Sequence, residues 1–391
     1  MRAVVIIDGE HYVPVVRDAL AELPYEVAGV FLAGGTEKLR GGEDYGVPLV
    51  DDFDEADVVV DLSDAPVLDP PRRFSLASRV LAEGIPYLGP DFHFDPPAFE
   101  PFELPSVAVI GTGKRVGKTA VTAHVARTLA QTLDVVVVAM GRGGPARPEV
   151  IERPPTVEAL LELSRSGRHA ASDHLETAVV TGVVTIGCRR AGGGLAGAVT
   201  TSNVPEGARL AAEREPDLVV FDGSGAAIPP IAVDRRILVV GPGQEATAFL
   251  NPYRVLISDL VLTLGGGGAD AEAIRLLKDV PVLSVELRLR PLEPLDGRRV
   301  AVFTAGPAPT DHLDAEVVKA STNLANRARL REDLADVDAD AYLVELKAAA
   351  IDVVAEAASA RGVQLVLAAN DVVSDELDVA LQELIPEGVR G

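Results

Sequence analysis

Cysteine is nearly absent from this chain of 391 residues, which contains only Cys188. A single cysteine cannot form an internal disulfide framework or a cysteine-rich zinc site. No histidine lies close to it in the sequence, so we expect a small buried thiol rather than a nucleophile. Long hydrophobic runs are also missing, because no apolar stretch reaches the roughly 18 residues that a membrane-spanning helix needs. The opening sequence MRAVVIIDGE is unlike a secretory signal. We therefore expect a cytoplasmic protein with no membrane partner.

Positive charge is scarce as well, since the chain carries a net charge of −23 at neutral pH. A global field of this sign repels polyphosphates, so we expect no nucleic-acid partner. An anionic ligand must instead meet a local concentration of basic side chains. Only six of the 36 basic residues are lysines, and two of these, Lys114 and Lys118, lie within residues 107–130. This segment is therefore the first candidate for an anion-binding site.

Apolar strands alternate with helical patterns along most of the chain, which predicts an α/β fold. Residues 3–8 and 26–34 are typical of strands, and residues 13–23 have the spacing of a helix. Strands separated by helices form parallel sheets, so we expect a doubly wound arrangement. A further helix is expected at 156–167, and further strands are expected at 106–111, 134–140, 178–187, 217–223, 235–241, 259–265, 298–306 and 363–371.

These elements predict three domains. We expect an N-terminal Rossmann-like α/β domain at 1–104, a central P-loop domain with a doubly wound parallel sheet at 105–290, and a smaller C-terminal α/β domain at 291–391. The segment PDFHFDPPAFEPFELP at 90–105 is rich in proline and aromatic residues, which is typical of a packed linker at a domain boundary.

The nine residues GTGKRVGKT, at the end of the predicted strand 106–111, have the composition of a phosphate-binding loop. A strand that turns sharply into a helix directs backbone N–H groups and the positive end of the helix at one spot. Lys118 supplies a charge for the β and γ phosphates of a nucleotide, and Thr119 supplies a hydroxyl for magnesium. The common pattern has a glycine where Thr112 stands, so the loop is of a variant type. We assign nucleotide binding to Gly111, Thr112, Gly113, Lys114, Arg115, Val116, Gly117, Lys118 and Thr119.

A carboxylate is needed to complete a magnesium site beside this loop. The stretch PDLVVFDGSG at 216–225 places Asp222 at the end of a predicted strand, where an acidic residue can hold a metal-bound water. We therefore expect Thr119 and Asp222 to hold Mg²⁺ together.

Two arginine-containing segments follow other predicted strands, at the edge where a doubly wound sheet binds ligands. MGRGGPARPEVIE contains Arg142 and Glu149, and CRRAGGG contains Arg189 and Arg190. Arginine matches the oxygens of phosphate and carboxylate groups, and the glycines leave the backbone free to wrap an anion. These four residues are candidate substrate ligands; solvated surface loops are the alternative for the same composition.

The segment IIDGEHYVPVV places Asp8 and His11 at the carboxyl end of the first predicted strand, another ligand-binding position. His11 can act as an acid, a base or a donor to phosphate. A capping role at the start of the following helix is the alternative. Both possibilities stay open, and we include Asp8 and His11 among the candidate substrate ligands.

The segments VIGTGKRVGKTAV, MGRGGPARPEVIE, CRRAGGGLAGAV and VFDGSGAAIPPI, together with IIDGEHYVPVV, resemble cyclic 2,3-diphosphoglycerate synthetases in all three predicted domains. That family is related to dethiobiotin synthetases, whose loops also begin Gly-Thr. The resemblance implies ATP-dependent closure of 2,3-diphosphoglycerate into an intramolecular cyclic pyrophosphate, with release of ADP and phosphate. It implies ATP and Mg²⁺ as cofactors, and we expect a homodimer for this class. We assign catalytic roles to Lys114, Arg115, Lys118 and Asp222.

Three other functions compete with this one. A ligase or kinase of the dethiobiotin synthetase type would act on another small anionic metabolite, whereas the arginines favour a highly anionic substrate. A guanine-nucleotide switch would need an Asn-Lys-x-Asp element, and the sequence contains none. A dinucleotide-binding sensor would need Gly-x-Gly-x-x-Gly after the first strand, which is also missing.

Overall fold

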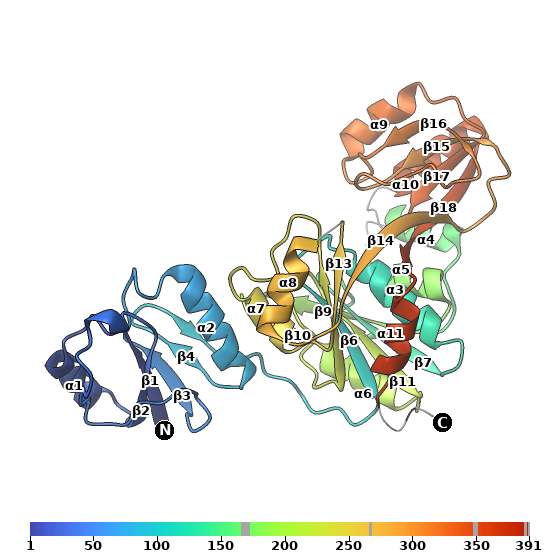
Figure 1. Cartoon of the computed structure of the whole chain (residues 1–391). Helices are drawn as coiled ribbons and strands as arrows, with labels where there is room; N and C mark the ends of the chain where they lie inside the picture. Colours follow the sequence, from blue (N-terminus) through green and yellow to red (C-terminus); the bar gives the residue numbers. More distant parts are fainter. Residues whose placement is uncertain (166–172, 266–267, 347–350, 387–388, 390–391) are drawn as a thin grey trace.

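Strands form two sheets in the computed structural model of the chain, which describes residues 1–165, 173–265, 268–346, 351–386 and 389. A five-stranded sheet belongs to the N-terminal part, and a thirteen-stranded sheet runs through the rest of the described chain. Figure 1 shows the N-terminal part (blue) on one side of the central sheet and the C-terminal strands (orange) above it. In the described chain no helix is long and apolar enough to cross a membrane. The α/β class agrees with the prediction from the sequence.

The N-terminal part consists of β1 (Arg2–Ile7), α1 (Val13–Glu22), β2 (Glu26–Leu32), the 3-10 helix η1 (Thr36–Lys38), β3 (Val58–Asp61), α2 (Pro70–Ala82), β4 (Tyr87–Leu88) and β5 (His93–Phe94). Its strand order is β2-β1-β3-β4-β5, with β5 antiparallel and the other pairs parallel. Because β1 lies between β2 and β3, the chain changes direction across the sheet at β1. The crevice between the carboxyl ends of β1 and β3 is therefore the topological switch point, where doubly wound sheets bind ligands.

The central part consists of β6 (Ser106–Gly111), α3 (Lys118–Leu129), β7 (Val135–Gly141), β8 (Glu149–Ile151), α4 (Val157–Arg165), α5 (Asp173–Thr181), β9 (Val184–Ala191), β10 (Thr201–Ser202), α6 (Val204–Ala212), β11 (Leu218–Asp222), β12 (Arg235–Val240), α7 (Asn251–Leu256), β13 (Leu260–Leu264), α8 (Gly268–Leu277) and β14 (Val282–Pro291). The strands β9, β7, β11, β6, β12, β13 and β14 are neighbours in that order and pair in parallel. Apolar side chains of one face pack against α3, and those of the other face pack against α6, α7 and α8. Helices thus cover both faces, which confirms the predicted doubly wound parallel sheet.

The strand predicted at 178–187 is wrong in its first half. Residues 178–181 form the last turn of α5, and β9 begins only at Val184. The helix ends because Gly182 adopts a φ of 72°, and its N–H donates to the carbonyl of Ala178 at 2.9 Å. A left-handed glycine stops a helix in this way. The spacing of the apolar residues does not reveal it, because the run AVVTGVV is apolar on both sides of the glycine.

The C-terminal part consists of β15 (Arg299–Phe303), β16 (Glu316–Ser321), α9 (Arg327–Ala335), β17 (Ala341–Glu345), α10 (Ile351–Arg361), β18 (Gln364–Val373) and α11 (Leu377–Leu384). β14 joins it to the central sheet, because β14 pairs in parallel with β13 up to Val285 and antiparallel with β18 from Glu286. The chain then returns to the central part, where Leu377 and Leu381 of α11 pack in the same core as α3. The domain boundaries at 104 and 290 stay predictions.

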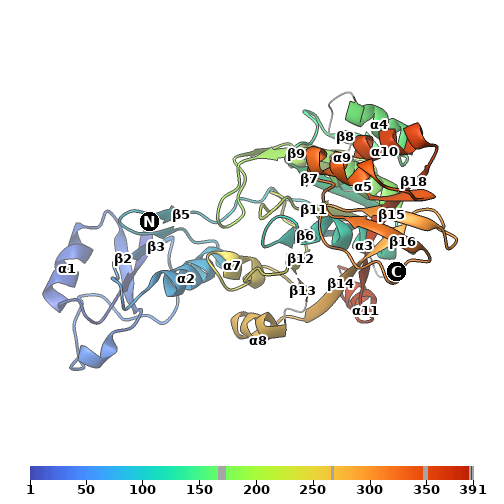
Figure 2. The ribbon, with the colours of Figure 1, turned by 90° about the horizontal axis from the view of Figure 1, so that it is seen from above.

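Part of the segment at 90–105 packs against the central part, as the sequence predicts, whereas His93–Phe94 form β5 of the N-terminal sheet. The ring of Phe102 lies 5.2 Å from that of Phe221 in β11, and Phe99 also packs against the core. The N-terminal part meets the central part through α2 and α7, and near this contact the rings of Phe74 and Phe249 are 5.9 Å apart. Figure 2 shows α2 beside α7 in a view from above.

Candidate nucleotide and substrate site

The loop at 111–119, called the phosphate loop below, joins the middle of the central sheet to helix α3. Two of its residues are left-handed, Arg115 with a φ of 59° and Gly117 with a φ of 85°. A β-carbon at Gly117 would lie only 2.7 Å from Leu264 Cδ2. Glycine is therefore required there by the backbone angle and by the space. The turn directs the amino end of α3 toward the carboxyl edge of the sheet, which is the geometry that binds phosphate.

Lys118 is the first residue of α3, and its side chain folds back over the phosphate loop. Its ammonium group donates a hydrogen bond to the carbonyl of Gly113 at 3.1 Å, and only 7% of the residue is exposed. A β-carbon at Gly111 would lie 2.9 Å from Lys118 Cδ, so the glycine makes room for the lysine stem. The loop thus holds a positive charge above its own backbone, the arrangement by which P-loops in general meet the β and γ phosphates of a nucleotide.

Thr112 has a structural role at the position where the common loop pattern has glycine. Its hydroxyl donates a hydrogen bond to the side-chain carbonyl of Gln244, in the segment that follows β12. Gly113 leaves room for the same side chain, because a β-carbon there would lie 2.7 Å from Gln244 Nε2. Gln244 therefore braces the first half of the phosphate loop. It cannot be found from the sequence, because no fixed spacing relates the segment after β12 to this loop.

Asp222 ends β11, the strand next to β6, where its backbone is in register with Val109. Its carboxylate accepts a hydrogen bond from the Thr122 hydroxyl at 3.0 Å, and both side chains are buried. Thr119 precedes Thr122 by three residues on α3, and residues three apart share one face of a helix. Hydroxyl and carboxylate oxygens are ligands that Mg²⁺ takes in nucleotide sites, so the residues present fit the predicted metal site. The spacing from Thr119 is the signal that could have identified Thr122.

Lys114 and Arg190 are neighbours in space although they are far apart in the sequence. Gly225, in the turn after β11, contacts both: a β-carbon there would lie 3.4 Å from Arg190 Nη2 and 3.6 Å from Lys114 Cγ. Arg190 also donates through Nη2 to the carbonyl of Ser224 at 2.7 Å. Burial, together with repulsion from the positive charge of Arg142, lowers the pKa of Arg190. The carboxyl edge of the sheet thus gathers cationic side chains beside the phosphate loop.

Arg189 lies on the other side of β9 from Arg190, because successive side chains of a strand point to opposite faces, and it is exposed. Its backbone N–H donates to Asn203 Oδ1 at 2.6 Å, and Asn203 Nδ2 donates to the carbonyl of Pro145 at 3.2 Å. Asn203 thus links β9 to the turn after β7, which contains Arg142. No sequence pattern marks Asn203, since its role depends on two loops that meet only in the fold.

Glu149 and Cys188 contact helices on opposite faces of the central sheet. Glu149 lies on β8, and its Oε2 is 3.7 Å from Nε2 of the buried His174 on α5. Cys188 is fully buried against Gly207 of α6, and burial raises the pKa of its thiol to about 12. The thiol is therefore protonated at neutral pH, which confirms the expectation of a small buried cysteine.

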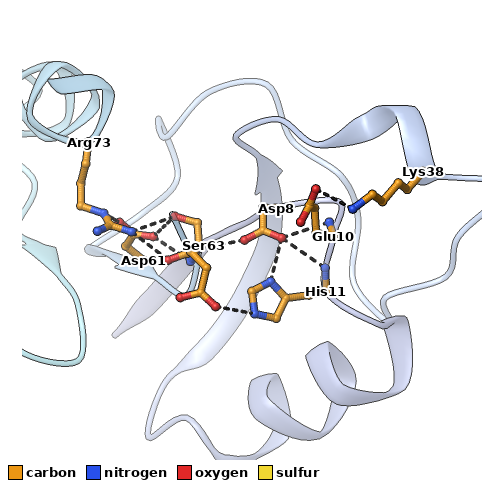
Figure 3. Close-up of polar contacts among 8 residues, drawn as sticks. Asp8, Glu10, His11, Lys38, Asp61, Ser63 and Arg73 are labelled. Carbon is orange, nitrogen blue, oxygen red and sulfur yellow. Dashed lines mark hydrogen bonds and ion pairs between the residues drawn. The ribbon is translucent and has the colours of Figure 1, made fainter. Parts of the chain in front are cut away.

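Asp8 and His11 lie at the switch point of the N-terminal sheet, with Asp8 at the centre of their hydrogen bonds (Figure 3). Asp8 Oδ1 accepts from the backbone N–H of Glu10 at 3.0 Å and lies 2.8 Å from His11 Nδ1. Its Oδ2 accepts from the backbone N–H of Asp64 at 2.8 Å. Burial raises the pKa of Asp8, but these hydrogen bonds outweigh burial and hold the pKa below its ordinary value. Asp8 thus ties the carboxyl end of β1 to that of β3.

A second polar network lies at the end of β3, next to the first (Figure 3). The buried Asp61 accepts from Arg73 Nε at 2.8 Å and from the Tyr87 hydroxyl at 2.6 Å. The hydrogen bonds and ion pairs described for Asp8 and His11 all lie within the N-terminal part. The structure therefore brings Lys114 and Arg190 together, whereas it holds Asp8 and His11 in a separate cluster.

A parallel sheet whose middle strand turns through a Gly-Lys-Thr loop into a helix, with a buried aspartate ending the next strand, defines the P-loop class of nucleotide-binding proteins. Models of the P-loop, N-terminal and C-terminal domains of cyclic 2,3-diphosphoglycerate synthetase match residues 106–279, 2–95 and 291–371 of this chain. The chain belongs to the cyclic 2,3-diphosphoglycerate synthetase family, a family of enzymes, as the resemblance in its sequence predicts.

Curated relatives with this name extend over nearly the whole chain. The protein of Rubrobacter xylanophilus is 46% identical, over 100% of this chain and 98% of its own length. Those of Thermococcus kodakarensis and Methanothermobacter thermautotrophicus are 41% and 37% identical, over 95% and 98% of this chain and 94% and 96% of their own lengths. Among solved structures, LpxK from Aquifex aeolicus in complex with ATP is 13% identical and covers 74% of this chain and 91% of its own, with a TM-score of 0.41. Membership of the family therefore follows from the sequence over its full length, and the distant structural likeness adds nothing to it.

Proposed function

We propose that this enzyme uses ATP to close 2,3-diphosphoglycerate into its cyclic pyrophosphate, with release of ADP and inorganic phosphate. The observation that carries the proposal is the meeting of Lys114 and Arg190 around Gly225, at the edge of the phosphate loop. A nucleotide site with further cations beside it suits an acceptor that is itself a phosphate. The name of the relatives, cyclic 2,3-diphosphoglycerate synthetase, supports this choice of substrate.

Two phosphates on adjacent carbons do not condense in water, because both are anionic and neither carries a good leaving group. In the proposed reaction, an oxygen of one substrate phosphate attacks the γ phosphorus of ATP, and the bond from that phosphorus to the β–γ bridging oxygen breaks to release ADP. An oxygen of the second substrate phosphate then attacks the inner phosphorus of the new pyrophosphate and expels inorganic phosphate. One phosphoanhydride of ATP is consumed for each one formed in the ring.

The protein has to neutralise charge and align the reacting groups in such a reaction. We assign Lys118 to the β and γ phosphates, because it lies over the phosphate loop with a hydrogen bond to its backbone. Lys114 and Arg115 extend the positive charge beyond the loop. Arg142 and Arg190 would hold the phosphates of the substrate, since their charges lie close enough to repel one another.

Thr119 and Asp222 would hold a magnesium ion beside the nucleotide. When bound, the ion neutralises charge on the β and γ phosphates during transfer. The Thr122 hydroxyl donates a hydrogen bond to Asp222 Oδ1 and so orients the carboxylate. Orienting partners of this kind tune the ligands that they contact.

Four further candidate substrate ligands lie outside the cluster around Gly225. Arg189 is on the opposite face of β9, Glu149 lies beside His174, and Asp8 and His11 are in the N-terminal part. Asp8 and His11 would reach the same substrate if the N-terminal part of this chain, or of a second copy, faced the phosphate loop.

We propose that the protein is a cytoplasmic homodimer. Light scattering that gives the mass of one chain would contradict the dimer.

Phosphorus NMR tests the proposed reaction directly. In a mixture of protein, ATP, Mg²⁺ and 2,3-diphosphoglycerate, we expect the signals of a cyclic pyrophosphate together with equal amounts of ADP and inorganic phosphate. The same mixture with Lys118→Ala protein should form these products about 10²–10³-fold more slowly. A ligase or kinase of the dethiobiotin synthetase type would leave 2,3-diphosphoglycerate unchanged, and that result with folded, ATP-binding protein would refute the proposed substrate.

A further inference from the structure

Arg254 is a charged residue outside the proposed reaction, and it is almost completely buried. It lies on α7 with 1% of its surface exposed. Its guanidinium donates hydrogen bonds to the carbonyls of Ala226 (2.7 Å from Nη2 and 3.2 Å from Nε), Leu195 (3.0 Å) and Leu250 (3.2 Å), and to Asn251 Oδ1 (3.2 Å). All of these oxygens are neutral, and burial lowers the pKa of Arg254 to about 10. An apolar side chain at this position would leave the carbonyls without their donor, which is costly in a buried place.

Arg254 and Arg190 bind the same two loops. These are the glycine loop, at 192–197, and the turn after β11, at 223–228. From the buried side, Arg254 binds the carbonyl of Leu195 in the glycine loop and that of Ala226 in the turn. From the side of the phosphate loop, Arg190 binds the carbonyl of Gly192 in the glycine loop and that of Ser224 in the turn. The two loops also share a backbone hydrogen bond of 2.9 Å. Arg254 therefore holds the loops together independently of Arg190.

Arg190 has the properties of a group that can change partners. It is half-buried beside Lys114, and among the described residues its Nε–H has no hydrogen-bond partner. The two carbonyls that it binds are uncharged, and hydrogen bonds to a charged phosphate oxygen are stronger. Arg190 can therefore exchange its hydrogen bonds to the two carbonyls for hydrogen bonds to a phosphate. This exchange requires that the two loops keep their shape without Arg190.

We propose that Arg254 is a positioning residue, which keeps the glycine loop and the turn after β11 in place when Arg190 turns from their carbonyls to a phosphate of the substrate. This inference rests on the proposed function, in which the substrate carries two phosphates. Arg254 does not touch the substrate in this role. It acts through Arg190, so its loss weakens the binding of the substrate and leaves the nucleotide site unchanged.

Steady-state kinetics of Arg254 variants test this role. Arg254→Met keeps the length of the side chain and loses its hydrogen bonds, whereas Arg254→Lys keeps the charge and a donor. We expect the KM for 2,3-diphosphoglycerate to rise about tenfold or more in Arg254→Met and less in Arg254→Lys, with the KM for ATP changed by less than about twofold. Arg254 acts on the substrate only through Arg190 in this proposal. The double variant Arg254→Met with Arg190→Ala should therefore bind the substrate no more weakly than the single variant Arg190→Ala. Equal rises in both KM values, or additive effects in the double variant, would overturn the proposal.

Amide hydrogen exchange of the ligand-free protein is a second test. It does not depend on the reaction, and it uses Arg254→Lys, so it does not require Arg254→Met to fold. In Arg254→Lys, we expect the amides of both loops to exchange faster than in the wild type; unchanged exchange would refute the role of Arg254. Arg298→Met is the matched control, because it removes a half-buried guanidinium that donates to the carbonyls of Leu295 and Pro294 in the C-terminal part. It should leave both loops and the substrate KM unchanged. Wild-type protein that does not convert 2,3-diphosphoglycerate would instead overturn the proposed function.

Discussion

Replacement of Thr122 by valine should weaken the magnesium site while it leaves the shape of α3 almost unchanged. Valine has nearly the same volume as threonine, but it cannot donate the hydrogen bond of 3.0 Å that Asp222 accepts. Thr122 is 0% exposed and Asp222 is 1% exposed, so water does not replace the lost donor. Removal of one partner from a buried polar pair costs about 1–3 kcal/mol. Loss of a residue that orients a metal ligand typically lowers metal affinity by about 10–100-fold.

The assay follows ATP turnover with 2,3-diphosphoglycerate while the concentration of Mg²⁺ is varied. We expect the half-saturating Mg²⁺ concentration to rise by about 10–100-fold in Thr122→Val, and urea unfolding to show a loss of about 1–3 kcal/mol. Thr122→Ser keeps the hydroxyl and should require Mg²⁺ as the wild type does. A wild-type Mg²⁺ requirement in Thr122→Val would refute the assignment of Asp222 to the metal, and a loss of stability alone would leave Thr122 a purely structural role.

Three further predictions concern the phosphate loop, the arginines and the cysteine. Lys118→Ala should lower ATP turnover by about 10²–10³-fold, the usual effect of losing one transition-state donor, with an unchanged circular dichroism spectrum; wild-type turnover would remove the phosphate loop from the mechanism. Arg190→Ala should raise the KM for the substrate far more than the KM for ATP, and Arg189→Ala should do so less because Arg189 faces the other side of β9. Equal changes in both KM values would instead place Arg190 at the nucleotide. Burial raises the pKa of the Cys188 thiol from its ordinary value of 9.0 to about 12, so folded protein at pH 8 should not react rapidly with a disulfide reagent, and unfolding in guanidinium should expose one thiol per chain. The unfolded thiol ionises near pH 9 while the folded thiol stays protonated, so the contribution of this group to stability is complete below pH 9 and is lost as the pH rises toward 12. A rapidly reacting thiol in folded protein would contradict the burial.

The sequence by itself determined those features whose chemistry lies within one stretch of chain. The phosphate loop is of this kind, because its strand, its glycines, Lys118 and the start of the helix follow one another directly. The position of Asp222 at a strand end was predictable too, since the carboxyl ends of parallel strands meet at one edge of a sheet. Prediction failed where the backbone of a single residue decides the structure, as at Gly182, whose φ of 72° ends α5 within an apolar run.

Only the tertiary structure decided which polar groups face one another. Thr112 bonds Gln244, and Lys114 lies beside Arg190, although no spacing along the chain relates the members of either pair. The order of strands in the sheet decides which loops are neighbours, and this order is set by packing over the whole domain. Arg189 and Arg190 show the converse, because they are consecutive in the sequence and lie on opposite faces of β9. The charged residues can therefore be identified from the sequence. Whether they lie close enough to bind one ligand depends on which strands are neighbours in the sheet.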